Sequence, residues 1–134
     1  MREESVLRQM VSSASPYERT IGFSRAIRVG KMIAVSGTAP IGPDGSTVAA
    51  GDAYGQARRC LEIIRAAVEE AGGHLGEVVR TRIYLTDARH WEAVGRAHGE
   101  VFGDIRPAAT MVVVAGLVRD DWMVEIEADA IVTP

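Results

Sequence analysis

The stretch from residue 109 to residue 115 most constrains the fold, because it has the residue types of a β-strand and contains no charge. Alternate residues of a strand point to opposite faces of a sheet. One face would receive Met111, Val113 and Ala115, and the other would receive Thr110, Val112 and Val114. A strand that is apolar on both faces is normally covered on both faces. The chain must therefore supply two covers for this strand, or find one of them elsewhere.

Two predicted helices are available as covers. The segment 52–71 begins with Asp52, a favourable N-cap residue, and ends before Gly72-Gly73, which can terminate a helix. Its apolar residues recur at the spacing of one helix face: Ala53, Ala57, Leu61, Ile64 and Val68. A second helix is expected after Asp87 and before Gly103. Its apolar stripe is formed by Trp91, Val94, His98, Val101 and Phe102.

The other segments have the short length and residue types of strands. They are residues 6–12, 24–29, 32–36, 79–86, 109–115 and 122–132. The two-residue connection Gly30-Lys31 predicts a tight antiparallel hairpin between the second and third of them. The order is β-β-β-α-β-α-β-β, which predicts one α+β domain over residues 1–134, with two helices on one face of a sheet.

Such a domain leaves the second face of the sheet without a cover from its own helices. A large exposed apolar patch usually marks an interface. We therefore expect another copy of the chain to cover it. The alternative is that the N-terminal segment folds over this face.

The last strand places three acidic residues on one side, Glu125, Glu127 and Asp129. Acids on a sheet face are most often solvated or paired with cations, and Arg80 and Arg82 on another strand could pair with them. The alternative is that a partly enclosed acid belongs to a site.

Composition argues against several classes of function. The net charge is −3 and the basic residues form no stripe, so neither nucleic acid nor a membrane is expected as a partner. The single cysteine, Cys60, lies on an apolar helix face, where thiols are usually inert. One cysteine and three scattered histidines make no zinc site, and no cofactor is expected. His98 is interpreted as a satisfied core or interface histidine. A charged N-terminus and the lack of any apolar run near 20 residues predict a cytoplasmic protein.

Several motifs taken together resemble the Rid family, also described as YjgF-like or endoribonuclease L-PSP proteins. The resemblance runs in order from about residue 15 to residue 132. It rests on Ser15-Pro16-Tyr17-Glu18, Gly22-Phe23-Ser24-Arg25-Ala26, Val35-Ser36-Gly37-Thr38, residues 79–87, residues 106–112 and Val124-Glu125-Ile126-Glu127-Ala128. It implies a chorismate-mutase-like fold and a homotrimer with three pockets between subunits that hold a small metabolite.

The resemblance also implies roles for individual residues. In deaminase members an arginine of a Pro-Ala-Arg-Ser-like motif binds the substrate carboxylate, and a glutamate on the final strand positions the attacking water. Glu125 matches that glutamate, which makes it the expected catalytic residue. The residues expected to bind substrate are Phe23, Ser36, Gly37, Ala109, Thr110 and Met111. Here Phe23 replaces a tyrosine, and Ala109 replaces the arginine.

The replacement at Ala109 removes a charge-assisted, two-pronged contact that contributes a few kcal/mol in an enclosed site. We therefore do not expect hydrolysis of 2-imino acids in the manner of the deaminases. Arg25 and Arg106 are nearby substitutes, although a surface position is expected for each. The leading hypothesis is an enzyme acting on a small reactive enamine, imine or carbonyl metabolite. A metabolite-binding module and a regulatory trimer are the alternatives, and RNA cleavage is not favoured.

Overall fold

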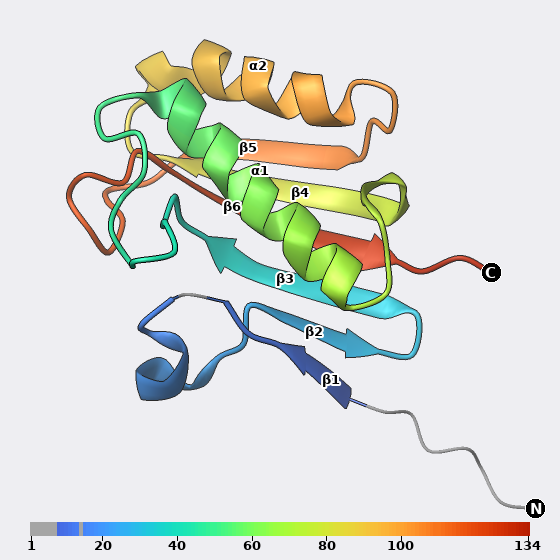
Figure 1. Ribbon diagram of the computed structural model, residues 1–134. Helices are drawn as coiled ribbons and strands as arrows, with labels where there is room; N and C mark the ends of the chain where they lie inside the picture. The colour runs from blue at the N-terminus through green and yellow to red at the C-terminus, as the bar shows by residue number, and fades with distance from the viewer. Residues whose placement is uncertain (1–7, 14) are drawn as a thin grey trace, which may run out of the picture.

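The computed structural model describes residues 8–13 and 15–134, and six strands in this part form one mixed sheet (Figure 1). The order across the sheet is β1-β2-β3-β6-β4-β5. The strands are β1 Arg8–Val11, β2 Ala26–Val29, β3 Met32–Thr38, β4 Val78–Leu85, β5 Ala108–Val113 and β6 Val124–Ile131. β4 and β5 run parallel, and the other neighbouring pairs run antiparallel. The predicted α+β order is confirmed.

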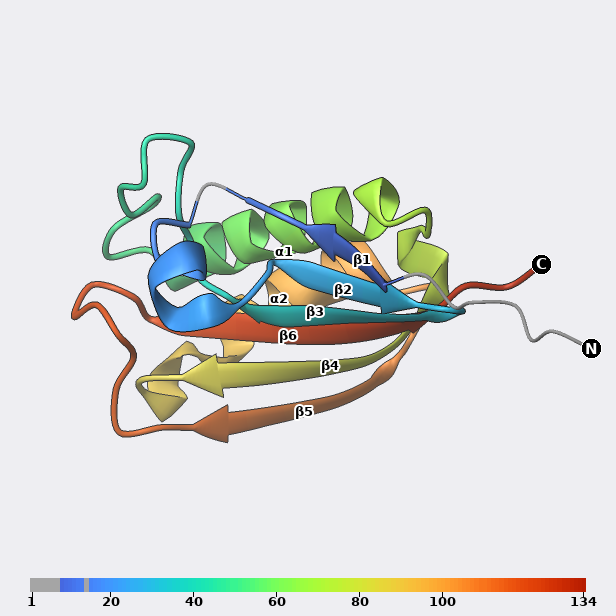
Figure 2. The same ribbon diagram turned by 90° about the horizontal axis from the view of Figure 1, so that it is seen from below.

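Helices α1 (Ala53–Glu70) and α2 (Trp91–Phe102) cover the same face of the sheet (Figures 1 and 2). Asp52 caps α1 by accepting a hydrogen bond from the Gly55 N–H at 3.1 Å. Asp87 instead caps a short turn, η3 (Ala88–His90), which continues directly into α2. The predicted stripe of α2 is wrong at Trp91, which is 58% exposed. The contact face of α2 centres on Ala97, together with Val94 and Phe102.

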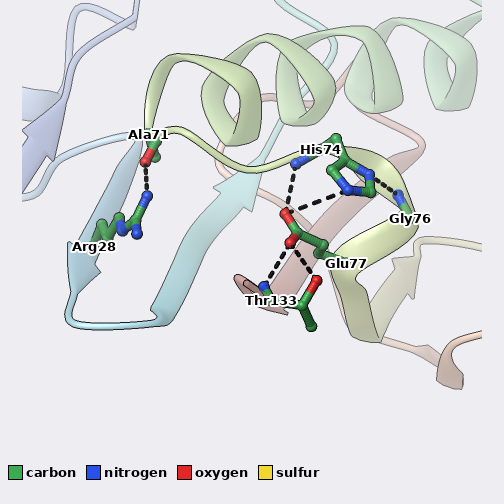
Figure 3. Close-up of polar contacts among 6 residues, drawn as sticks. All are labelled: Arg28, Ala71, His74, Gly76, Glu77 and Thr133. Carbon is green, nitrogen blue, oxygen red and sulfur yellow. Dashed lines mark hydrogen bonds and ion pairs between the residues drawn. The ribbon is translucent and has the colours of Figure 1, made fainter.

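Polar contacts join the segment after α1 to β2 and to the chain after β6 (Figure 3). Arg28 of β2 donates to the Ala71 carbonyl at 2.8 Å. In the turn η2 (Leu75–Glu77), the buried Glu77 carboxylate accepts from the backbone of His74 at 3.1 Å and from the backbone of Thr133 at 2.6 Å. The bonds from Thr133 lower the pKa of Glu77. This carboxylate therefore joins the start of β4 to the chain that follows β6.

The two faces of the central strands differ in chemistry. Toward the helices, β4 and β6 bury Thr81, Ile83, Leu85, Val124, Ile126, Ala128 and Ala130. On the open face, Arg82 pairs with Asp129 at 3.2 Å and Glu127 at 3.6 Å, and the Tyr84 hydroxyl donates to Glu127 at 2.8 Å. Cross-strand pairing is thus confirmed for Arg82, whereas within the described residues Arg80 forms no ion pair.

The first strands form the far edge of the sheet. β2 and β3 make the predicted hairpin, with Val29 opposite Met32 and Gly30 at a φ of 60°. The strand expected at residues 6–12 is observed as β1, although residues 6 and 7 lie outside the described residues. β1 pairs with β2 and extends the sheet. The described part of the N-terminal segment therefore does not cover the open face, contrary to the alternative considered from the sequence.

β5 forms the opposite edge and ends at Val113, before the predicted residues 114 and 115. Of its residues only Met111 is even half-buried, and Val112 and Val113 are 42% and 54% exposed. Val112 pairs with Tyr84, whose neighbours Ile83 and Leu85 face the helices, so Val112 and Tyr84 share the open face. The uncharged strand singled out from the sequence therefore lies largely uncovered in a single chain.

Candidate functional site

A cavity of about 360 Å³ lies between α1, the end of β1 with the following residues 12–13 and 15–25, and the adjoining ends of β3 and β6. A volume of this order suits a small metabolite. One side of α1 lines the cavity, through Arg59, Glu62, Ile63, Ala66, Ala67 and Glu70. Arg59 is held in place because it donates to the Ile41 carbonyl at 2.8 Å and to Glu62 at 3.3 Å.

An aromatic cluster forms another wall of the cavity. The rings of Tyr17 and Trp122 meet edge to face, with centroids 6.5 Å apart. The Arg119 guanidinium lies 5.6 Å from the Tyr17 centroid and 5.2 Å from the Trp122 centroid. Arg119 also donates to the Gly45 carbonyl at 2.7 Å, so this cation is fixed behind the aromatic rings. Ile21 and Val118, which also line the cavity, are 66% and 72% exposed and form an apolar rim.

Glu125 lines the cavity at a point where the backbone of the neighbouring strand β3 is irregular. The register between β3 and β6 shifts between Val35 and Thr38, and Gly37 lies in this bulge. A Cβ atom at position 37 would lie 2.6 Å from Glu125 Oε1. Only glycine therefore lets the carboxylate approach the strand this closely. Burial raises the pKa of Glu125, Arg25 acts in the opposite direction, and Glu127 raises it further.

Arg25 lies beside Glu125 in the cavity lining and is 5% exposed, so the surface position expected from the sequence is wrong. Its Nη1 atom donates to the Gly37 carbonyl at 2.6 Å and the Thr38 hydroxyl at 2.9 Å, and contacts the Ser36 carbonyl at 3.4 Å. Its Nε atom donates to the Ser13 hydroxyl at 3.3 Å. Burial lowers the pKa of Arg25, while Glu18 and Glu125 oppose that effect. By contrast, Arg106 is exposed and is not among the residues that line the cavity.

The structure brings together part of the predicted site. Phe23, Gly37 and Glu125 line the cavity, and the Phe23 ring lies 5.4 Å from the Arg25 guanidinium. Ser36 is adjacent but outside the lining, and its hydroxyl donates to the Ser24 carbonyl at 2.6 Å.

The three predicted residues of β5 lie elsewhere in the chain. β4 separates β5 from β6, so β5 lies about 10 Å across the sheet from Glu125's strand. Ala109 and Met111 pair with the inward-facing Thr81 and Ile83, whereas Thr110 pairs with Arg82 of the open face. Within one chain, Ala109, Thr110 and Met111 do not line the cavity.

Sequence reasoning missed the aromatic wall and the burial of Arg25. The partners of Arg25 are two backbone carbonyls and two hydroxyls, none of which marks an arginine-binding position in a sequence. Arg119 is equally hard to identify, since it binds the Gly45 carbonyl and the Tyr17 ring, both from distant segments, besides its near neighbour Trp122.

Other groups considered from the sequence are placed as follows. Cys60 is fully buried, and burial raises the pKa of its thiol. His98 contacts the Thr81 hydroxyl at 2.9 Å, and burial lowers its pKa, which fits a satisfied core histidine. Among the described residues, no group of three or more His, Cys, Asp or Glu side chains is arranged to hold a metal ion. In the same part of the chain, no helix has both the length and the apolar character needed to cross a membrane.

Comparisons with known proteins agree with this architecture. A family model described as Endoribonuclease L-PSP matches residues 14–132. The chain is 37% identical over 130 residues to the uncharacterized protein SCO2049 of Streptomyces coelicolor, covering 97% of this chain and 95% of that protein. It is 36% identical over 105 residues to the 3-aminoacrylate deaminase RutC of Acinetobacter baylyi, covering 78% of this chain and 82% of that protein.

Solved structures show the same fold. Rv2704 of Mycobacterium tuberculosis, described as a member of the YjgF/YER057c/UK114 family, is 44% identical with a TM-score of 0.85, covering 94% of this chain and all of that one (100%). The YjgF gene product of E. coli is 31% identical with a TM-score of 0.80, covering 92% of this chain and 98% of that one.

Proposed function

This chain belongs to the endoribonuclease L-PSP family, which includes the YjgF and Rid proteins, and we propose that its cavity binds and converts a small reactive enamine, imine or carbonyl metabolite. The observation that carries this proposal is Glu125, a partly buried carboxylate that lies close to Gly37 at a cavity of metabolite size. Deamination by the relative RutC, a 3-aminoacrylate deaminase, supports the choice of substrate class.

Glu125 is suited to general acid–base chemistry because its pKa is raised toward neutrality by burial. In the proposed reaction, Glu125 accepts a proton from water as the water oxygen bonds to the imine carbon. The same carboxyl then returns a proton to the nitrogen. Glu125 next takes the hydroxyl proton of the resulting carbinolamine and passes it to the nitrogen. The carbon–nitrogen bond breaks as the carbon–oxygen double bond forms, and the products are a carbonyl compound and ammonia. Atoms balance with water as the only other reactant.

We further propose that the working protein is a homotrimer in the cytoplasm. The exposed apolar residues of β5, Val112 and Val113 among them, support a cover by another copy of the chain. Since Ala109, Thr110 and Met111 do not line the cavity of their own chain, they would reach a site only across such an interface. Neither nucleic acid nor a membrane is proposed as a partner, because the net charge is −3.

Ala109 limits which substrates this site should convert well. Without a guanidinium on β5, an incoming carboxylate lacks a strong two-pronged partner at that position. We propose that turnover of 2-imino acids is slow. The second candidate function is binding without turnover, as a metabolite-binding or regulatory trimer, and the substitution at Ala109 is the observation that favours it.

The test is ammonia release from freshly generated 2-iminobutyrate, measured beside a Rid deaminase as positive control. The wild-type rate should fall well below that of the control. Ala109→Arg should raise it by about tenfold or more, since a bidentate ion pair contributes more than 1.4 kcal/mol. Glu125→Gln should lower the rate by roughly 10²- to 10⁴-fold. A wild-type rate equal to that of the control would refute the role assigned to Ala109, and an unaffected Glu125→Gln variant would refute the role of Glu125.

A further inference from the structure

Resting on the proposed function, we propose that Arg25 is the anion-binding residue of this cavity, so that the carboxylate of the ligand is held by the chain that also supplies Glu125. Arg25 and Glu125 both line the cavity. The ligand would then place its anionic group on Arg25 and its reacting carbon toward Glu125. A β5 arginine would add a second contact to this carboxylate and speed the turnover of 2-imino acids, but binding itself would not depend on one.

The hydrogen bonds that Arg25 forms with described residues leave one nitrogen of its guanidinium, Nη2, unused. All of its hydrogen bonds to described residues use Nε and Nη1. Among the described residues, the only fully buried side-chain nitrogen or oxygen without a partner is Trp122 Nε1. Within the described residues, Nη2 has no hydrogen-bond partner and is not among the fully buried atoms that lack one. Arg25 is only 5% exposed and lines the cavity, so we infer that the accessible surface of Nη2 faces the cavity and can contact a ligand.

The charge of Arg25 is also incompletely compensated. Its hydrogen-bond partners are neutral carbonyl and hydroxyl oxygens, and it forms no ion pair within 4.0 Å in the described part of the chain. The nearby Glu18 carboxylate is occupied by Ser13, accepting from its N–H at 2.9 Å and its hydroxyl at 2.7 Å. Glu18 and Glu125 attract the Arg25 cation from a distance, but neither carboxylate forms an ion pair with it. A ligand carboxylate in direct contact would add a short-range attraction to a cation whose desolvation cost has already been met in folding.

Arg25 is held rigidly before any ligand binds. Contacts to Gly37 and Thr38 at 2.6 and 2.9 Å anchor one side of the guanidinium, and the Phe23 ring lies 5.4 Å from its central carbon. A fixed side chain loses little conformational entropy on binding, which favours affinity. The remaining lining is largely apolar, including Ile21, Ile63, Val118 and Trp122. The ligand class that fits is a monocarboxylate with a compact apolar body.

The competing explanation is that Arg25 only fixes the bulge that contains Gly37. In that case its loss would disturb binding of every ligand, charged or neutral. The distinguishing quantity is therefore the preference for a carboxylate over the matching amide, which a purely structural role would leave unchanged.

We would measure binding of two probes, 4-methyl-2-oxopentanoate and its neutral amide, to the wild-type protein and to Arg25→Gln and Arg25→Lys. The wild type should prefer the carboxylate. Arg25→Gln should weaken carboxylate binding about 10- to 100-fold and leave amide binding within about twofold, as expected for loss of one charge-assisted contact. Arg25→Lys should retain part of the preference, since it keeps the charge but not the fork of donors.

Two further variants identify the source of the preference. Arg65→Gln, on the exposed side of α1, serves as the control and should bind both probes like the wild type. If Arg106→Gln abolished the carboxylate preference while Arg25→Gln retained it, the proposal would be overturned. Equal weakening of both probes by Arg25→Gln would also overturn it, in favour of the structural explanation.

A measurement on the wild-type protein covers the case in which the Arg25 variants fail to fold. In nitrogen-15 NMR of the arginine side chains, the carboxylate probe should shift the Arg25 guanidinium signal, and the amide should not. An unchanged Arg25 signal at a saturating concentration of the carboxylate probe would refute the proposal that Arg25 binds the carboxylate. The wild type could bind both probes equally while Glu125→Gln alters that binding. The proposed function of the cavity would then stand, and the proposed role of Arg25 in binding the carboxylate would be refuted. If the wild type binds neither probe, both proposals fail.

Discussion

The two strands β5 and β6 show that burial in this protein follows position in the sheet more than apolar character. β6 lies between β3 and β4, and every second residue from Val124 to Ala130 is buried, although Glu125, Glu127 and Asp129 alternate with them. β5 carries no charge, yet it lies at the edge and is mostly exposed. The apolar residues of β6 stabilise the single chain. Those of β5 are left available for contact with another molecule.

The largest expected effect comes from weakening β6 itself. Ile126 is fully buried in the core, and Ile126→Ala should leave a cavity that costs about 2–5 kcal/mol in the free energy of unfolding. Chemical denaturation followed by circular dichroism measures this loss. Trp91→Ala is the control, because Trp91 is 58% exposed and its truncation should change stability by about 0.5 kcal/mol or less. A similar loss of unfolding free energy in both variants would contradict the conclusion that the central position of β6 determines its contribution to stability.

A smaller effect is expected when a charge is placed on β5. Val112 lies on the open face and is 42% exposed, so Val112→Asp should be tolerated by the folded single chain. In an assembly it would bury an unpaired carboxylate, which costs about 3 kcal/mol and weakens association roughly 100-fold. Sedimentation velocity over a dilution series measures the change.

Trp91→Asp provides the matched control for association, because Trp91 is exposed but belongs to the helix side of the sheet. It should leave the oligomeric state unchanged. If the wild-type protein sediments as single chains at working concentration, β5 is not an interface between copies. The proposed role of residues 109–111 in a shared site would then be withdrawn.

The smallest effect concerns the dependence of stability on pH. Burial holds the pKa of Glu125 above its ordinary value of 4.5, so the folded state binds this proton more tightly than the unfolded state does. The stability that the protonated group contributes is complete below pH 4.5 and is lost as pH rises through the folded pKa. Relative to wild type, Glu125→Gln should therefore gain stability, seen as a higher Tm, on going from pH 4 to pH 7. Thermal unfolding of both proteins at pH 4 and pH 7 measures this change. If the difference in Tm between variant and wild type is the same at both pH values, Glu125 is effectively solvated.

The sequence predicts well those features that depend on residues close together in the chain. The alternation in β6 and the cap at Asp52 required only spacing and local chemistry. The cavity could not be predicted in this way, since its lining joins Ser12, Arg59 and Glu125 from segments that meet only in the folded chain. The bulge beside Gly37 and the burial of Arg25 depend on backbone carbonyls, which every residue carries.

Trp122 gives the protein a built-in optical reporter of events in its cavity. The chain has two tryptophans, and they are in opposite surroundings: Trp122 is 4% exposed and lines the cavity, while Trp91 is 58% exposed. With Trp91 replaced by phenylalanine, all indole emission would come from Trp122 beside the Arg119 cation. Entry of a small molecule would then be visible as a change in colour or intensity of that emission, without any label attached.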